Sequence, residues 1–202
     1  KNGISQSEVL DFTELAAVAT VGDVMDLQGE NRIIVKEGLR QLSATHTPGL
    51  RALIRANNLD GAEITAYHVG FVLGPCINAS GRLDTAARSL ELLCETNEER
   101  AAELAGDLLA LNQSRKAMTE KGKEEAIRLI EETGLNEDRV LVVYLPDCHE
   151  SLAGIIAGRI REKYHKPVFV LTKGENSVKG SGRSIEAYSM YEEMVKCGDL
   201  LI

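Results

Sequence analysis

The chain has 202 residues, a length that fits one large domain or two small ones and can bury a sizeable core. Its composition, 44% hydrophobic and 27% charged, is that of an ordinary globular protein, and no apolar run is long enough to span a membrane. The formal net charge of -8 argues against a protein that coats duplex nucleic acid with positive potential. Four widely spaced cysteines without a CxxC pair exclude zinc-ribbon spacing and favour a reducing compartment, so we expect a cytoplasmic protein.

The first third of the chain is predicted to be helical with short breaks. Residues Glu8 to Ala19 are rich in Val, Leu and Ala, which favours a helix. Thr47 is a predicted N-cap because Pro48 follows it, and proline is favoured at the first helical position. We expect the helix that starts there to reach about Asn57.

A third helix is expected over Ala66 to Leu73, with Gly74 and Pro75 as its stop signal. Residues 76–81 are then predicted to form a loop, and a further helix is expected over residues 83–93.

A long helix is predicted from Asn97 to Thr133, because no proline or turn cluster interrupts this segment. Thr96 and Glu99 have the spacing of a capping box at its start. Both ends carry an apolar stripe and the middle does not, a pattern typical of a helix that connects two domains. Two helices broken near Gly122 remain the alternative.

Beyond Gly134 the pattern changes to strands and helices. The short β-branched runs Val140 to Leu145 and Val168 to Leu171 predict strands buried on both faces. The helical pattern of Ser151 to Tyr164 lies between them, so we expect a parallel pair with a right-handed crossover. A glycine-rich strand or loop over Val178 to Ile185 and a helix over Tyr188 to Lys196 follow. The expected fold class is therefore α/β: a helical part, a connecting helix and a small α/β domain.

The basic surplus of the chain lies near the C-terminus, where residues 149–196 hold eight Lys and Arg against six Asp and Glu. Within it, a glycine-rich stretch suits a phosphate, because backbone N–H groups, an arginine fork and hydroxyls come together there. The candidate binding residues are Gly180, Ser181, Gly182, Arg183 and Ser184. A turn with one solvated arginine remains the alternative.

Asn78 and Arg82 form a second candidate, because they lie on a small-residue stretch that leads into a helix start. The alternative is a plain interhelical connection in which Arg82 pairs with Asp84 or Glu91.

Two further candidates complete the set. His149 follows the first predicted strand, where open α/β sheets place ligands, and it could donate to a phosphate while Glu150 orients it. Asp23 and Asp26 could supply oxygen ligands to a divalent cation, although solvated surface aspartates are the commoner case.

Three stretches together resemble RecJ-type single-stranded-DNA-specific exonucleases of the DHH phosphoesterase superfamily. They are ATVGDVMDL at Ala19 to Leu27, GPCINASGRL at Gly74 to Leu83, and HESLAGIIAGR at His149 to Arg159 with KGSGRS at Lys179 to Ser184. The order of these stretches and the long helix between the second and third make the combined pattern specific.

The resemblance implies a metal-dependent exonuclease of two domains. Residues 1–96 would be the C-terminal part of a DHH catalytic domain, 97–133 the connecting helix, and 134–202 a truncated DHHA1-type phosphate-binding domain. It implies two divalent metal ions, Mn²⁺ or Mg²⁺, and stepwise 5′-to-3′ hydrolysis of phosphodiester bonds in DNA repair and recombination. The implied partner is single-stranded DNA; the oligomeric state is open, with a monomer favoured.

By position, Asp23 matches the last metal-binding aspartate of the family and would be the catalytic residue of this chain. Asn78 and Arg82 match the loop that faces the substrate phosphates, and His149 with Gly180 to Ser184 matches the phosphate side of the second domain. Cys76 stands where many relatives have arginine, which puts one phosphate contact in doubt.

No DxD and no Asp-His-His motif is present, and these motifs supply most metal ligands in the family. We therefore interpret the chain as an internal fragment that is inactive by itself. A small DHH phosphoesterase acting on short oligonucleotides or cyclic dinucleotides, and a non-catalytic nucleic-acid-binding module, are the alternatives.

Overall fold

The computed structural model of the chain describes residue 10 and residues 12–200. The chain divides into two compact units, Lys1–Gln113 and Ser114–Ile202. Over the described part, no helix is both long enough and apolar enough to cross a membrane.

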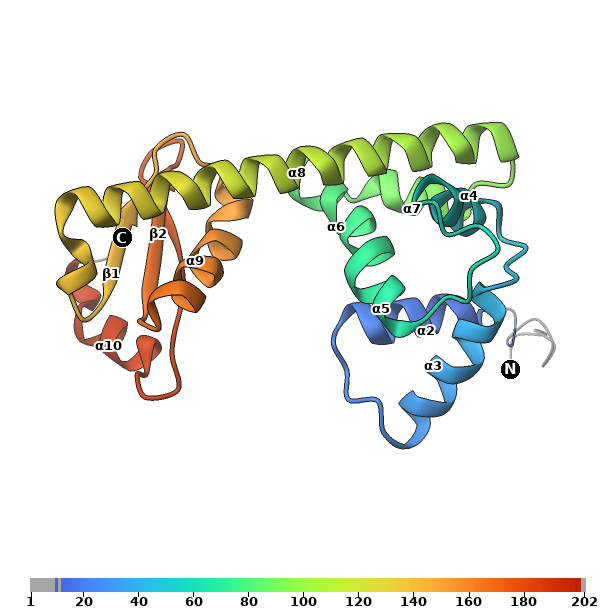
Figure 1. The fold of residues 1–202 in the computed structure, drawn as a ribbon, viewed down its shortest axis with the longest axis horizontal. Coiled ribbons are helices and arrows are strands. Elements are labelled where there is room, and N and C mark those ends of the chain that lie inside the picture. The colour runs from blue at the N-terminus through green and yellow to red at the C-terminus, as the bar shows by residue number, and fades with distance from the viewer. Residues whose placement is uncertain (1–9, 11, 201–202) are drawn as a thin grey trace. The chain divides into compact units, whose positions relative to one another are not determined.

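All regular secondary structure among the described residues of the first unit is helical (Figure 1). Its core is built from leucines that are fully buried, among them Leu42, Leu50, Leu53, Leu73 and Leu92. The helices are α2 (Thr13–Gly22), α3 (Gly29–Leu42), α4 (Pro48–Ala56), α5 (Ala66–His68), α6 (Gly74–Leu83), α7 (Ala87–Cys94) and the first part of α8 (Glu98–Thr133), with a π-helix at Val69–Leu73 between α5 and α6.

The helix expected from Glu8 is found as α2, which begins at Thr13; the start of the prediction lies outside the described residues. The start of α4 is confirmed, with Thr47 as an extended N-cap and Pro48 at the first helical position. The Thr47 hydroxyl does not cap the helix. It donates a 2.5 Å hydrogen bond to Oε1 of buried Glu14, which ties α4 to α2.

The predicted loop over residues 76–81 is wrong, because α6 runs through this segment. Gly74 donates its N–H to Val69 O, so a π-helical turn carries the chain past the expected stop. Pro75 then stands in the first turn of α6, directly after the π-helical turn, and its ring nitrogen supplies no N–H at this junction. The next helix begins at Ala87 and not at residue 83.

Helix α8 is continuous over 36 residues, so the alternative with a break near Gly122 is wrong. None of residues 113–121 in its middle is buried, whereas Leu108 and Ile130 on either side are fully buried. The expected capping box is also wrong. Asn97 is the cap, and its Oδ1 accepts the Arg100 N–H at 2.9 Å.

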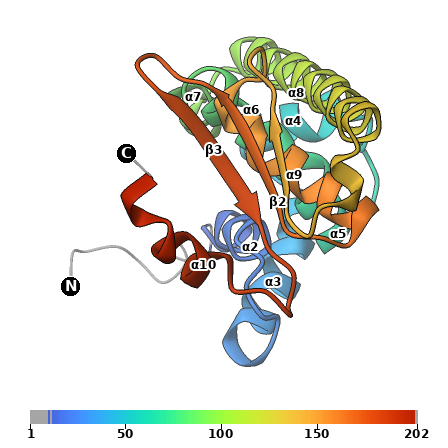
Figure 2. The same cartoon turned by 90° about the vertical axis from the view of Figure 1, so that its left-hand side faces the viewer.

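The second unit contains a three-stranded mixed sheet with α9 packed on one face (Figure 2). Strands β1 (Leu141–Tyr144) and β2 (Val168–Lys173) are parallel and are joined by α9 (Glu150–Tyr164), which confirms the predicted strand-helix-strand unit. Strand β3 (Val178–Arg183) pairs antiparallel with β2, and α10 (Met190–Lys196) follows.

The prediction that the strands are buried on both faces is wrong for β1. Leu141 and Val143 are buried, whereas Val142 and Tyr144 on the other face are 47% and 46% exposed. A continuous run of β-branched and aromatic residues is compatible with a strand that is buried on one face or on both, since valine and tyrosine favour strands in either case.

Candidate phosphate-binding site

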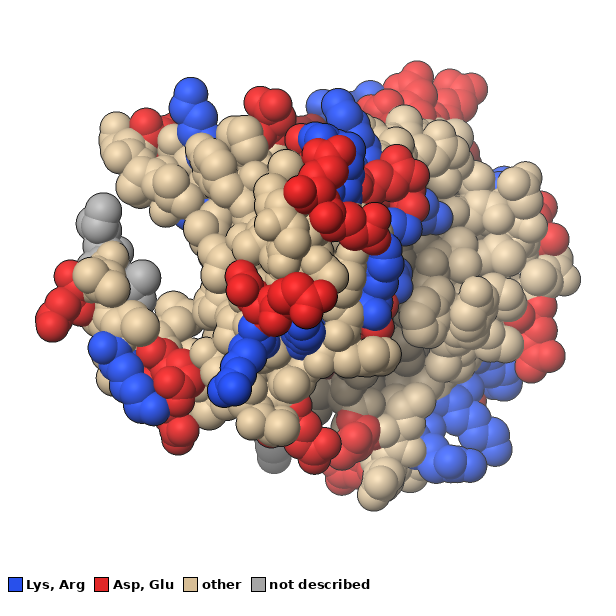
Figure 3. All heavy atoms as spheres, turned by 60° about the vertical axis from the view of Figure 1, so that its left-hand side comes forward, with Lys and Arg blue, Asp and Glu red and all other residues tan. Residues whose placement is uncertain are grey.

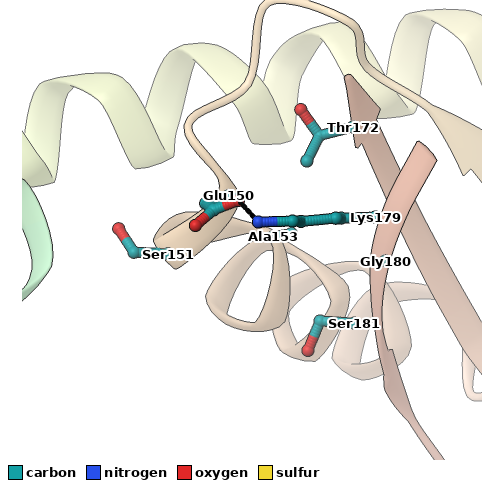
Figure 4. A pocket seen from close by; sticks show the side chains of 7 residues that line it. All are labelled: Glu150, Ser151, Ala153, Thr172, Lys179, Gly180 and Ser181. Carbon is teal, nitrogen blue, oxygen red and sulfur yellow. Dashed lines mark hydrogen bonds and ion pairs between the residues drawn. The ribbon is translucent and has the colours of Figure 1, made fainter. Parts of the chain in front are cut away.

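A pocket of about 310 Å³ lies between the first turn of α9 and strand β3 (Figure 4). Seven residues line it: Glu150, Ser151, Ala153, Thr172, Lys179, Gly180 and Ser181. The pocket therefore combines a helix N-terminus, one lysine, one glutamate and three hydroxyl side chains.

The alternation of β3 directs its polar side chains toward α9. Ser181 pairs with Val170 and Arg183 with Val168, and both valines are fully buried on the sheet face that α9 covers. Lys179, two residues before Ser181, lies on the same face. The lysine, the serine and the arginine thus form one row along the α9 side of the strand.

The glycines of this stretch have a packing role that the sequence did not predict. The segment is a strand and not a phosphate-cradling loop, and neither glycine has positive φ. A Cβ atom on Gly180 would lie 2.4 Å from Leu171 Cδ2. A Cβ atom on Gly182 would lie 2.4 Å from Met190 Sδ and 2.9 Å from the Phe169 ring. Both glycines make room for side chains on the face away from α9.

Gly154 is a site residue that the sequence reasoning missed. A Cβ atom here would lie 2.8 Å from both Arg183 Nη2 and Ser181 Oγ, so its absence lets these side chains lie against α9. The available signal was the small residues Ala153, Gly154, Ala157 and Gly158 at helical spacing, a pattern that permits close approach of a helix to a strand.

Arg183 is held by neutral acceptors. Its Nη1 donates to Gly182 O at 2.7 Å and to Ser181 Oγ at 3.5 Å. No Asp or Glu among the described residues lies within ion-pair distance of it. Ser184 has another task, because its hydroxyl donates to Tyr188 O and closes the turn after β3.

Lys179 forms an ion pair on the pocket wall. Its Nζ lies 2.7 Å from Glu150 Oε2, which joins β3 to the first turn of α9. The hydrogen bond from Lys179 holds the pKa of the Glu150 carboxyl below its usual range, and the carboxylate in turn raises the pKa of Lys179. The expectation that Glu150 orients His149 is therefore wrong.

His149 is the N-cap of α9. Its Nδ1 accepts the Ser151 N–H at 3.3 Å and lies 2.8 Å from Ser151 Oγ. Since a backbone N–H only donates, the neutral ring carries its proton on Nε2. His149 faces a second hollow of about 150 Å³. Its lining residues are Met118, Lys121, Gly122, Glu125, Leu145, Asp147, Cys148, His149 and Leu152.

The candidates of the first unit lie on helix α6. Asn78 and Arg82 are exposed and one helical turn apart, so they share a face. Asp84 and Glu91 pair with other arginines, Arg88 and Arg100.

Cys76, also on α6, lies in the core of the first unit. Its side chain is fully buried, and its sulfur accepts a hydrogen bond from Asn112 Nδ2 at 3.3 Å and donates to Asn57 Oδ1 at 3.7 Å. In this chain, position 76 therefore packs against α8 and α4 and contributes no phosphate contact on a surface loop.

Asp23 follows the last residue of α2 and is exposed. Within residues 10 and 12–200, no group of three His, Cys, Asp or Glu side chains is placed to hold a metal ion. A divalent cation needs several oxygen ligands, so the described residues do not form a metal site around Asp23.

Residues 137–199 match the DHHA1 domain family. They form a DHHA1 domain. The chain is 39% identical over 190 residues to the single-stranded-DNA-specific exonuclease RecJ of Dickeya dadantii, covering 92% of the chain and 33% of that protein. It is 35% identical to RecJ of Escherichia coli over 205 residues, and the match covers 99% of this chain and 36% of that protein. The resemblance to RecJ-type exonucleases is thus confirmed, and the chain spans about a third of the length of these relatives.

Solved structures agree with the sequence comparison. RecJ of Thermus thermophilus in complex with Mn²⁺ superposes with a TM-score of 0.83 at 35% identity, covering 96% of this chain and 28% of that one. An exonuclease RecJ bound to manganese superposes with a TM-score of 0.84 at 34% identity, and the match covers 99% of this chain and 49% of that one. These proteins hold divalent metals, whereas the described residues of this RecJ-like chain lack the ligands for one.

Proposed function

We propose that this chain belongs to a single-stranded-DNA-specific exonuclease of 5′-to-3′ polarity, active in DNA repair and recombination, and that its DHHA1 domain binds a phosphate of the strand. One observation carries the proposal: the pocket between α9 and β3, in a RecJ-like chain, is lined by Lys179 and two serine hydroxyls and adjoins Arg183.

The chemistry of the pocket suits a phosphodiester. Its oxygens accept hydrogen bonds from ammonium and guanidinium groups, which are stronger than those between neutral partners. The positive end of the α9 dipole adds to the attraction, because a 15-residue helix begins at the pocket.

The surface charge favours one strand over a duplex. On the face that Figure 3 shows, Lys and Arg lie in small groups among Asp and Glu and form no continuous basic patch. A protein of net charge -8 with local cationic sites is suited to holding one backbone at a few points. The exposed side chains of Asn78 and Arg82 on α6 are proposed as further contacts.

Cleavage of the strand needs metal ligands that the described residues do not supply. In the proposed enzyme, Asp23 is one ligand of a divalent-metal site whose other ligands these residues do not provide. The 202-residue chain by itself then binds the strand without hydrolysing it. The 36-residue helix α8 and the RecJ similarity over nearly the whole chain favour this assignment over a small DHH phosphoesterase.

Binding of a fluorescent oligothymidylate, followed by anisotropy over a salt series, tests the proposal. Arg183→Ala should weaken binding for every base composition alike and lower the slope of log K against log salt by about 0.7. Arg159→Ala is the matched control, because Arg159 lies on α9, pairs with Glu162 and does not line the pocket. If both variants bind as the unmodified chain does and remain folded, the proposed phosphate site is wrong.

A further inference from the structure

The lysine of the phosphate pocket already has an anionic partner. Lys179 Nζ and Glu150 Oε2 are 2.7 Å apart, and the pair joins β3 to α9 inside the pocket lining (Figure 4). The two residues are 29 positions apart in sequence, so the fold brings them together.

The carboxylate stands where a bound anion would be favoured. It projects from the first residue of α9, at the positive end of the helix dipole. Ser151 and Ser181 line the same pocket, and in Figure 4 their hydroxyls lie on either side of the pair and point away from it. Glu150 is ionised at neutral pH, because the hydrogen bond from Lys179 keeps the pKa of its carboxyl low.

We propose that Glu150 is an internal substitute for the DNA phosphate: its carboxylate occupies Lys179 in the free protein, and a phosphate of the strand displaces it on binding. This inference rests on the proposed function of the pocket. Displacement requires little rearrangement, because both side chains are more than half exposed and solvent weakens their attraction.

The exchange has a consequence for an exonuclease. A phosphodiester and a carboxylate each carry one negative charge, so Lys179 is neutralised in both states. The returning carboxylate assists release of the strand, which has to move by one nucleotide after each cleavage. Glu150 should therefore weaken strand binding and reduce its dependence on salt, since the displaced carboxylate regains a cation when a phosphate takes its place.

The test compares Glu150→Gln with Glu162→Gln in the oligothymidylate assay. Both changes remove one negative charge from α9 at nearly equal exposure, 54% and 55%, but Glu162 pairs with Arg159 outside the pocket. Glu150→Gln should tighten binding at low salt by about two- to fivefold, within the strength of a surface ion pair. It should also steepen the salt slope by up to about 0.7, and Glu162→Gln should do neither.

A double-mutant cycle tests whether the effect of Glu150→Gln depends on Lys179. In a Lys179→Ala background, Glu150→Gln should no longer tighten binding beyond the effect of Glu162→Gln, because the lysine that it frees is absent. Glu150→Asp keeps the charge on a shorter side chain and should lie between the unmodified chain and Glu150→Gln. Melting curves show that each variant is folded.

The outcomes separate the two proposals. If Arg183→Ala and Lys179→Ala leave binding unchanged, or the unmodified chain does not bind the oligonucleotide, the phosphate pocket itself is wrong. If they weaken binding while Glu150→Gln behaves as Glu162→Gln does, or keeps its effect without Lys179, the pocket remains and the role of Glu150 is wrong.

Discussion

The guanidinium of Arg183 lies over Gly154, where a Cβ atom would approach Nη2 to 2.8 Å. The contact links the α9 sequence LAGIIAG to the KGSGRS strand, two segments that lie apart in the sequence. A substitution at Gly154 should therefore displace the Arg183 side chain while every charged residue stays unchanged.

Gly154→Ala should weaken oligonucleotide binding without loss of stability. The new methyl group meets the mobile ends of Arg183 and Ser181, which can shift, and alanine favours the helix by up to about 1 kcal/mol. Gly158→Ala is the control, because nothing lies within 4 Å of its Cβ position on the same helix. Anisotropy and melting curves on both variants check this; equal binding by the two would contradict it.

The Glu150–Lys179 pair should make a pH-dependent contribution to stability. The pKa of Glu150 is lowered in the folded chain, so its contribution is present above the unfolded-state pKa of about 4.3 and is lost as pH falls through the folded value. The pKa of Lys179 is raised, so its contribution is present below the unfolded-state pKa of about 10.4 and is lost as pH rises through the folded value.

Melting temperatures of the unmodified chain and of Glu150→Gln across pH measure this contribution. The unmodified chain should be the more stable near neutral pH, and the difference should disappear in acid. A difference that persists at pH values well below the lowered pKa of Glu150 in the folded chain would show that the ion pair is not its source.

The sequence predicted the elements whose hydrophobic period is clear. The spacing of Leu152, Ile155, Ile156 and Ile160 predicted α9, and the β-branched runs predicted β1 and β2 with their parallel pairing. The uninterrupted segment between Asn97 and Thr133 predicted α8. In each case local pattern and tertiary packing agree, so the pattern alone is sufficient.

The predictions that failed lie where tertiary packing overrides a local sequence signal. Gly74 and Pro75 look like a helix stop, but the π-helical turn before them and the buried face of α6 carry the helix on. The candidate site shows the same limit. Arg183 and His149 could be named from their motifs, whereas the Glu150–Lys179 pair and the role of Gly154 depend on the packing of α9 on β3.

Gly122→Ala shows how packing reverses a propensity argument. Helix propensity alone predicts a neutral or stabilising change of about 1 kcal/mol at most. In the structure a Cβ atom at Gly122 would lie 2.5 Å from Cδ1 of fully buried Ile156. We therefore expect Gly122→Ala to be less stable than Gly106→Ala by about 1 to 3 kcal/mol, since Gly106 in the same helix has open space at its Cβ position. Urea unfolding of both variants measures the difference, and equal stabilities would show that Ile156 repacks freely.

The purified chain should release no mononucleotides from a labelled single strand in Mg²⁺ or Mn²⁺, and neither ion should raise its melting temperature. Asp23 is exposed at the end of α2, and the described residues supply no cluster of ligands around it. A metal pair that stabilises both the attacking and the leaving oxygen requires several carboxylate or histidine ligands held in fixed geometry. Asp23→Asn is the control, because it should match the unmodified chain in both measurements. Metal-dependent release that Asp23→Asn abolishes would show that a functional metal site exists in this chain, and the division between strand binding and cleavage proposed for it would be wrong.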